Sequence, residues 1–245
     1  MYNTPMMTRF EGKISCKAIL ENPKREIQQV WIDKKKRDRD TQYILRLCKN
    51  RGCKVTFLER SKLDEMASSH THGGILIDAN PLSSVYFSEI QDPHGYFVYI
   101  DGIEDPYNLG SAARTLYAAG CNGLILPDRD WSNAETTIIK ASAGAFEKLD
   151  IFRIKEDNEL VETLDQHHIP LYAAHRKDAM SLYDFSFPDT FCLAIGGALR
   201  GLNANITSHS SQNIMIEYGR DFRNALDTPS ACAVFGFEIL RQKRQ

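Results

Sequence analysis

The chain has 245 residues, of which 42% are hydrophobic and 25% charged, enough apolar material for one large or two small folded domains. Its net charge of −2 excludes a global basic field, so any nucleic acid must be held by a local patch. The six cysteines form no C-x-x-C pair, which favours buried thiols over disulfides or a metal site. No apolar run approaches the ~20 residues that span a membrane, and the N-terminus lacks the apolar core of a signal peptide. We therefore expect a cytoplasmic protein.

Short strands and helices alternate through the first part of the chain. Strands are predicted at 29–32, 54–58 and 74–77, and helices at 41–50 and from Ser61 onward.

The apolar pattern then breaks down between Asp78 and Gly95, where prolines and serines intervene. We therefore predict an N-terminal domain over 1–80, a linker over 81–95 and a second domain over 96–245.

The second domain alternates apolar runs and helical patterns more regularly. Apolar strands without polar alternation, joined by helices, imply an α/β fold with a parallel sheet covered on both faces. The strands are predicted at 96–100, 123–127, 150–154, 170–174, 191–196 and 213–218, and the helices at about 109–119, 133–141, 158–167 and 229–242. The interval 197–212 is rich in Gly, Asn and Ser, so an irregular connection is expected there.

The segment from Asp105 to Gly120 carries the strongest functional signal. It lies between two apolar runs, with Asn108 and Gly110 at a predicted turn and Arg114 one turn into the following helix. A polar loop that feeds a helix N-terminus presents backbone N–H groups to an anionic or oxygen-rich ligand, and a guanidinium adds further donors. The segment therefore predicts a functional site.

Two glycine-bearing loops follow predicted strands near the C-terminus. One contains Gly196 and Gly197, and the other runs from Ile214 to Ala231 into the last helix. Because ligands bind outside the carboxyl ends of strands in open parallel sheets, these loops and the 105–120 segment suggest one shared pocket. For any single loop, a tight turn without a ligand is the alternative. The sequence lacks G-x-G-x-x-G in the first strand–helix turn, which disfavours an oxidoreductase with a nicotinamide cofactor.

These motifs, in this order, resemble those of the SpoU (TrmH-like) RNA 2′-O-ribose methyltransferases of the SPOUT superfamily. The shared pattern comprises Asn108-x-Gly-x-x-x-Arg114, the Ile195-Gly-Gly loop closing with Gly201-Leu202, the segment 140–145, and the Leu226 loop that enters the last helix. This resemblance covers essentially 96–245. Residues 10–80, including His72-Gly-Gly-Ile75, resemble the family's N-terminal substrate-binding domain, which is similar to small RNA-binding ribosomal proteins.

The resemblance implies S-adenosylmethionine-dependent 2′-O-methylation of structured rRNA or tRNA, by a domain with a deep trefoil knot near its C-terminus. By motif position, Gly196, Gly197, Ile216 and Leu226 would contact the cofactor largely through main-chain atoms. Such enzymes are usually homodimers with the active site near the subunit interface, and neither a metal nor a membrane is implied.

The implied chemistry suggests roles for the first motif. A ribose 2′-hydroxyl is a weak nucleophile that must lose its proton as it attacks the sulfonium methyl group, and holding the two in line supplies much of the rate. With a pKa above ~12, Arg114 is a poor general base, so we expect it to clamp a phosphate or the developing oxyanion. The family proposal of this arginine as an activator stays open, as does an exposed ion pair. Asn108 would orient the hydroxyl or fix the loop.

Three positions depart from the family pattern. Ala198 stands where a glutamate is frequent, Asp227 replaces an asparagine, and Pro229 replaces a serine. Asp227 keeps an acceptor without the amide donor, and Pro229 suits the first turn of the last helix. These departures motivate a second hypothesis, a non-catalytic RNA-binding or assembly protein on the same scaffold.

Local basic residues are the candidates for RNA contact. Lys35 and Arg37 lie in a basic run of the N-terminal domain, although interleaved aspartates make a solvated loop the alternative. Arg220 and Arg223, beside the third loop, are better placed to approach a substrate.

Overall fold

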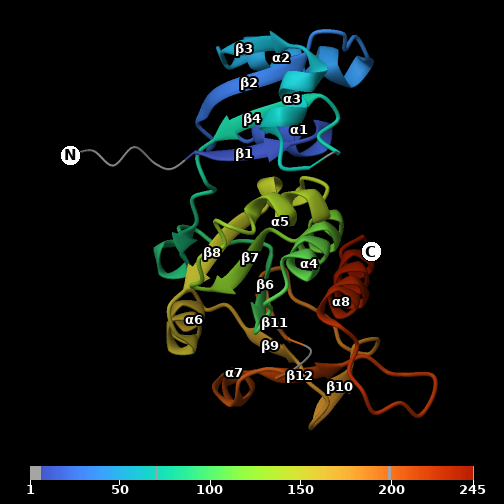
Figure 1. Cartoon of the computed structure of the whole chain (residues 1–245). Helices are drawn as coiled ribbons and strands as arrows, with labels where there is room; N and C mark the ends of the chain where they lie inside the picture. The colour runs from blue at the N-terminus through green and yellow to red at the C-terminus, as the bar shows by residue number, and fades with distance from the viewer. Residues whose placement is uncertain (1–6, 70, 198–199, 245) are drawn as a thin grey trace. The chain divides into compact units, whose positions relative to one another are not determined.

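The computed structural model describes residues 7–69, 71–197 and 200–244 (Figure 1). The chain forms two compact units, one of Met1–Ser83 with Trp131–Lys148 and one of Ser84–Asp130 with Leu149–Gln245. The division at 80 and 96 that the sequence suggests stays a prediction. No helix in the described part of the chain is long and apolar enough to cross a membrane.

The first unit contains a four-stranded sheet in the order β1-β4-β2-β3, in which only β2 and β3 run parallel. Its elements are β1 (Thr8–Glu11), α1 (Lys13–Glu21), β2 (Ile27–Asp33), α2 (Arg39–Asn50), β3 (Val55–Leu58), α3 (Arg60–Met66), β4 (Ile75–Ala79), α5 (Glu135–Ala141) and η2 (Ala145–Lys148). The predicted strands and helices of this region are confirmed. The sequence pattern missed β1 and α1, since the four residues of β1 are too few to show a period.

The core of the first unit lies between its sheet and its helices. Asp38 caps α2 by accepting a hydrogen bond from the backbone N–H of Thr41, and Ile44 and Cys48 then fall on the buried face. Ile139 of α5 belongs to the same apolar cluster. A segment that the sequence places between two strands of the second domain is therefore part of the N-terminal core.

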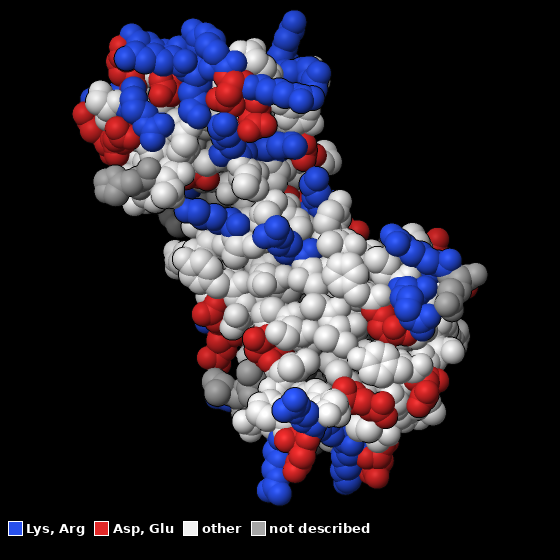
Figure 2. Space-filling model, turned by 90° about the vertical axis from the view of Figure 1, so that its right-hand side faces the viewer, with Lys and Arg blue, Asp and Glu red and all other residues white. Residues whose placement is uncertain are grey.

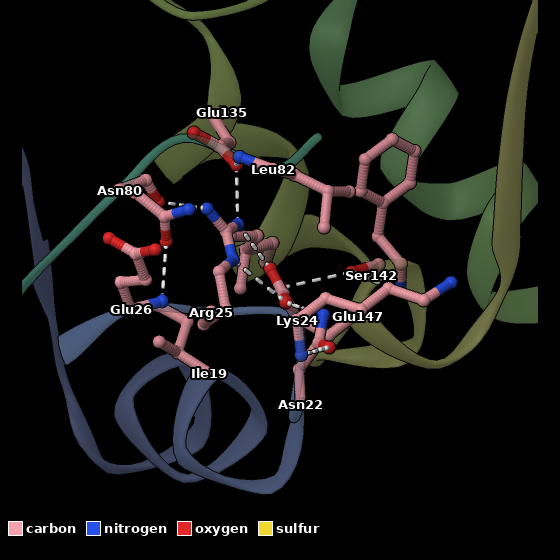
Figure 3. A network of polar contacts seen from close by, with 12 residues as sticks. Ile19, Asn22, Lys24, Arg25, Glu26, Asn80, Leu82, Glu135, Ser142 and Glu147 are labelled. Atoms are coloured by element: carbon pink, nitrogen blue, oxygen red, sulfur yellow. Dashed lines mark hydrogen bonds and ion pairs between the residues drawn. The ribbon is translucent and has the colours of Figure 1, made fainter. Parts of the chain in front are cut away.

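A buried ion network also fixes α5 and η2 within the first unit (Figure 3). The guanidinium of Arg25 pairs with the carboxylates of Glu135 and Glu147, and all three side chains are buried. Asn22 donates to Glu147 at 2.7 Å, and the backbone N–H of Leu82 donates to Glu135 at 2.8 Å. Burial raises the pKa of the Glu135 carboxyl, although Arg25 acts in the opposite direction.

The second unit is an eight-stranded sheet in the order β10-β12-β9-β11-β6-β7-β8-β5, and every neighbouring pair is parallel. Its elements are β5 (Val85–Tyr86), η1 (Phe87–Glu89), β6 (Tyr96–Asp101), α4 (Pro106–Ala118), β7 (Gly123–Pro127), β8 (Asp150–Ile154), α6 (Asp157–Gln166), β9 (Leu171–Ala174), β10 (Ala179–Ser181), β11 (Phe191–Gly196), α7 (Ala204–His209), β12 (Gln212–Met215) and α8 (Thr228–Gln242). The predicted α/β fold with a parallel sheet is confirmed.

Helices cover both faces of this sheet, with α4 and α8 on one side and α6 and α7 on the other (Figure 1). The side chains of successive β6 residues lie on opposite faces of the sheet. Phe97 and Tyr99 belong to the apolar cluster that includes α6 and α7, whereas the Tyr96 hydroxyl donates to the carbonyl of Ala119 behind α4. Burial on both faces explains the continuous apolar runs in the sequence.

Two expectations about the region after β11 are wrong. The interval 197–212 contains a short helix, α7, because the side chain of Asn203 caps it by accepting from the N–H of Asn205. The last strand ends at Met215 instead of 218, so Ile216 lies beyond the sheet. Within the predicted linker, β5 pairs with β8 and so extends the sheet.

Candidate functional site

A cavity of about 290 Å³ lies at the carboxyl ends of β9, β11 and β12. Gly196, Gly197, Ile216 and Leu226, the four residues assigned to a cofactor by motif position, all line it. The remaining walls come from the loop after β9, from Gly201 and Leu202, and from one face of α8. The structure thus brings the second and third motifs together, while their contact with a cofactor stays a prediction.

Close backbone packing explains the glycines of the second loop. A Cβ on Gly196 would lie 2.4 Å from the carbonyl carbon of Gly201, and a Cβ on Gly197 would lie 2.6 Å from the oxygen of Gly102. Gly201 has a φ of +66° and closes the loop by donating its N–H to Gly197 at 2.9 Å. Ala198, the residue after Gly197, lies outside the described residues.

The third loop enters α8 through a side-chain cap. The Asp227 carboxylate accepts a hydrogen bond from the N–H of Ser230 at 2.7 Å. Hydrogen bonding to the side chain of Ser230, and then to its backbone N–H, lowers the pKa of that carboxyl. Pro229 lies in the first turn, as expected. Thr228 donates to the carbonyl of Gly196 at 3.3 Å, which ties the start of α8 to the second loop. Asp227 therefore keeps the capping function of an asparagine.

Three further lining residues, His175, Arg176 and Tyr218, were not singled out from the sequence. His175 and Arg176 directly follow the apolar run of β9, so their place at the carboxyl end of a parallel strand was the signal that could have found them. Both Arg176 and Tyr218 hydrogen-bond to the third loop.

An acidic cluster at the end of β6 was also missed. Asp101 accepts a hydrogen bond from the N–H of Asn203 at 3.0 Å, and Asp157 accepts from the hydroxyl of Tyr99 at 3.0 Å. Burial, with a contribution from Asp157, raises the pKa of the Asp101 carboxyl. The side-chain amide of Asn203 also donates to Asp157, so both carboxylates anchor the N-terminus of α7, which follows the second loop.

The first motif lies on α4 and outside the cavity lining. The Asp105 carboxylate caps α4 by accepting from the N–H groups of Tyr107 and Asn108, and Pro106 occupies its first turn. The helix therefore begins earlier than expected. Asn108 belongs to its first turn, and Arg114 lies about 12 Å along the axis from Pro106, so placing Arg114 one turn into the helix was wrong.

Both side chains of this motif, Asn108 and Arg114, are exposed. Among residues 7–69, 71–197 and 200–244, no acidic side chain pairs with the Arg114 guanidinium. The ion-pair alternative is therefore not what the structure shows, and the guanidinium can meet a ligand from solvent.

The four residues expected to contact RNA are exposed as well. Arg223 also lines the cavity. Arg37 donates to the carbonyls of Lys34 and Lys36, and the ammonium of Lys35 has no partner within the described residues.

A parallel sheet with a ligand-sized cavity at its carboxyl ends, built from glycine loops and a helix N-terminus, defines an α/β domain of the small-molecule-binding class. Comparison with known families is more specific. The profile of the SpoU rRNA methylase family matches residues 95–236, and the profile named RNA 2′-O ribose methyltransferase substrate binding matches residues 10–85. The chain therefore belongs to the SpoU rRNA methylase family, which confirms the resemblance.

Sequence relatives are similar to this chain over nearly its full length. A putative TrmH family tRNA/rRNA methyltransferase of Bacillus subtilis, YacO, is 28% identical over 97% of this chain and 98% of its own. The 23S rRNA (guanosine-2′-O-)-methyltransferase RlmB of Salmonella typhimurium is 23% identical over 97% and 100%.

Among solved structures, the SpoU methyltransferase AviRb of Streptomyces viridochromogenes, in complex with AdoMet, aligns with a TM-score of 0.80 at 16% identity, over 98% of this chain and 91% of its own. A crystal structure of an RNA 2′-O ribose methyltransferase also gives 0.80, at 17% identity, over 99% and 91%. The fold is therefore that of the SpoU enzymes.

Proposed function

We propose that this protein is an RNA methyltransferase that transfers a methyl group from S-adenosylmethionine to a ribose 2′-hydroxyl in structured rRNA or tRNA. The observation that carries the proposal is the cavity at the ends of β9, β11 and β12, because the second and third motif loops converge there. Membership of the SpoU family supports the same reaction, and it does not favour the non-catalytic alternative.

The cavity fits this cofactor in its chemistry. Ile195, Leu202 and Ile214 give apolar walls, and the glycine loop exposes main-chain groups to the interior. Small-molecule sites combine such walls with a few polar groups that fix orientation. When bound, the cofactor supplies an electrophilic methyl group on its sulfonium, while the loops of the protein exclude water around it.

We assign the RNA to the exposed face of α4. Arg114 offers a fork of five N–H donors that suits a phosphate or a developing oxyanion, and it is not engaged by an acidic neighbour among the described residues. Asn108 would orient the ribose hydroxyl. Arg220 and Arg223 would neutralise phosphates near the cavity, and Lys35 and Arg37 would do so on the first unit.

A homodimer formed through α4 and α8 is part of the proposal. Tyr107 and Tyr117 of α4 are 66% and 41% exposed, Phe237 of α8 is 50% exposed, and the two helices pack side by side. Figure 2 shows a broad, mostly uncharged area over this side of the second unit. Such a surface is typical of a protein interface, and Arg114 on the same helix would lie near the partner. The deep trefoil knot stays a prediction.

Methyl transfer tests the proposal. Purified protein with tritiated S-adenosylmethionine should label rRNA or tRNA from cells that lack the gene, and mapping should place a 2′-O-methyl at one nucleotide. Absence of label in both RNA pools, by protein that binds the cofactor, would favour the non-catalytic alternative. Light scattering should give twice the chain mass of 27.8 kDa, and Phe237→Glu should give a monomer. A monomeric wild type would contradict the dimer.

A further inference from the structure

The third loop of the cavity is held by two side chains that belong to no motif. We infer that Arg176 and Tyr218 are positioning residues, which together hold residues 217–226 in the shape that receives the cofactor. This inference rests on the proposed function, because it assigns S-adenosylmethionine to the cavity that both residues line.

The loop cannot be held by apolar burial of its own. Every residue from 219 to 225 is exposed, and only Leu226 is partly buried at its end. Tyr218 and Phe222 contact each other as tilted rings 6.1 Å apart, but Phe222 is itself 53% exposed. Because ordering a loop costs about 1–2 kcal/mol per residue in backbone entropy, hydrogen bonds and ring contacts must fix this shape.

Arg176 supplies the first set of contacts. Its two terminal nitrogens donate to the carbonyl oxygens of Arg223 and Asn224, at 2.9 and 3.0 Å. Its guanidinium also lies 4.5 Å from the ring centre of Tyr218. One planar side chain from the loop after β9 thus contacts both ends of the third loop, a geometry that lysine cannot reproduce.

Tyr218 supplies the second contact. Its hydroxyl accepts a hydrogen bond from the backbone N–H of Leu226 at 3.1 Å. Leu226 lines the cavity and stands directly before Asp227, the cap of α8. The bond therefore closes the loop across eight residues and fixes the orientation of the Leu226 N–H at the edge of the cavity.

The chain of contacts from Arg176 through Tyr218 to Leu226 predicts an effect on affinity and not on the chemical step. A preorganised loop lowers the entropy that binding must otherwise supply. Loss of one hydrogen bond should weaken binding roughly three- to tenfold, and loss of the arginine with its three contacts should weaken it more than tenfold. The kcat at saturating cofactor should change less than twofold.

Amide hydrogen exchange of the protein without cofactor tests the inference independently of activity. In Tyr218→Phe, which keeps the ring, the Leu226 amide should exchange roughly three- to tenfold faster than in the wild type. In Arg176→Ala the Leu226 amide should also exchange faster, because the Tyr218 ring loses the guanidinium against it, and Arg176→Lys should give a rate between those of the wild type and Arg176→Ala. Tyr183→Phe and Arg244→Ala are the matched controls, since both residues are exposed and lie outside the cavity.

Calorimetry with S-adenosylmethionine on the same variants completes the test. The expected order of dissociation constants is wild type and controls, then Tyr218→Phe, then Arg176→Ala. Unchanged exchange and unchanged affinity in both Arg176→Ala and Tyr218→Phe would overturn the inference, as would an equal fall of kcat in all variants. If the wild type itself binds no cofactor, the proposed function is overturned, and the exchange data alone decide whether the two residues hold the loop.

Discussion

The cavity and the exposed face of α4 are two parts of one candidate site, and they are built in opposite ways. The cavity is made by backbone: Gly196 and Gly197 are there because a Cβ would strike a neighbouring chain segment. The α4 face would act through side chains, since Asn108 and Arg114 are exposed and lie outside the cavity lining. We therefore expect changes in the cavity to alter cofactor affinity, and changes on α4 to alter turnover.

Arg25→Met should have the largest effect, and it tests whether the cavity and the exposed face of α4 are independent of the first unit. Arg25→Met would leave Glu135 and Glu147 buried without their cation, so the first unit should lose about 3–5 kcal/mol of stability. Because the cavity lies wholly in the second unit, cofactor affinity should not change.

Thermal unfolding followed by calorimetry measures this loss, and Arg39→Met is the control. Arg39 is exposed at the start of α2 and has no side-chain partner among the described residues, so its replacement should change stability by less than about 0.5 kcal/mol. Equal unfolding temperatures for the two variants would show that the buried network does not stabilise the first unit.

Arg114→Ala tests the α4 face. We expect methyl transfer to RNA to fall by roughly 10²–10³-fold, because one charge-stabilising donor at the reacting hydroxyl is lost. The dissociation constant of S-adenosylmethionine should stay within about twofold of wild type in calorimetry, since the residue lies outside the cavity lining. Full activity in this variant would refute a catalytic role. Lost cofactor binding would contradict the assignment of cofactor affinity to the cavity and of turnover to the α4 face.

Gly196→Ala tests the cavity. The added Cβ would lie 2.4 Å from the backbone of Gly201, so the second loop must move. Overpacking costs about 1–3 kcal/mol, and we expect the cofactor dissociation constant to rise roughly tenfold. Gly219→Ala is the control, because open space surrounds Gly219. The same affinity in both variants would mean that the loop shape does not set binding.

The smallest effect concerns the start of α8. Asp227→Ala removes the cap and should cost about 1 kcal/mol, whereas Asp227→Asn should keep it. Because the folded-state pKa of Asp227 is lowered, its contribution is present above the ordinary value of 3.8 and is lost as pH falls through the folded pKa. Denaturant melts between pH 5 and 2.5 should show this loss in wild type and not in Asp227→Asn. Identical profiles would exclude the cap as the cause.

The sequence predicted six strands of the second unit, β6 to β9, β11 and β12, because they read as apolar runs, but it missed the short strands β5 and β10. It predicted the loops at Gly196 and Leu226 because their residue types carry the motif. The place of Arg176 just after β9 could have been read from the sequence, but its contacts could not, since a guanidinium that contacts a loop more than forty residues away leaves no local pattern. The same holds for Arg25, whose partners Glu135 and Glu147 lie more than one hundred residues away.

The start of α4 shows a different limit of prediction from the sequence. The sequence pointed to Asn108 and Arg114 but placed the helix start too late, because the cap at Asp105 and the proline after it were read as part of the turn. Residue types were therefore easier to predict than the geometry of their side chains.

Calorimetric titration of the wild-type protein with S-adenosylmethionine is the decisive test of whether the cavity at the ends of β9, β11 and β12 holds the cofactor. We expect saturable one-site binding per chain that Gly196→Ala weakens and Arg114→Ala leaves unchanged. No detectable heat with properly folded protein, or equal weakening by both substitutions, would contradict the assignment of the cofactor to this cavity.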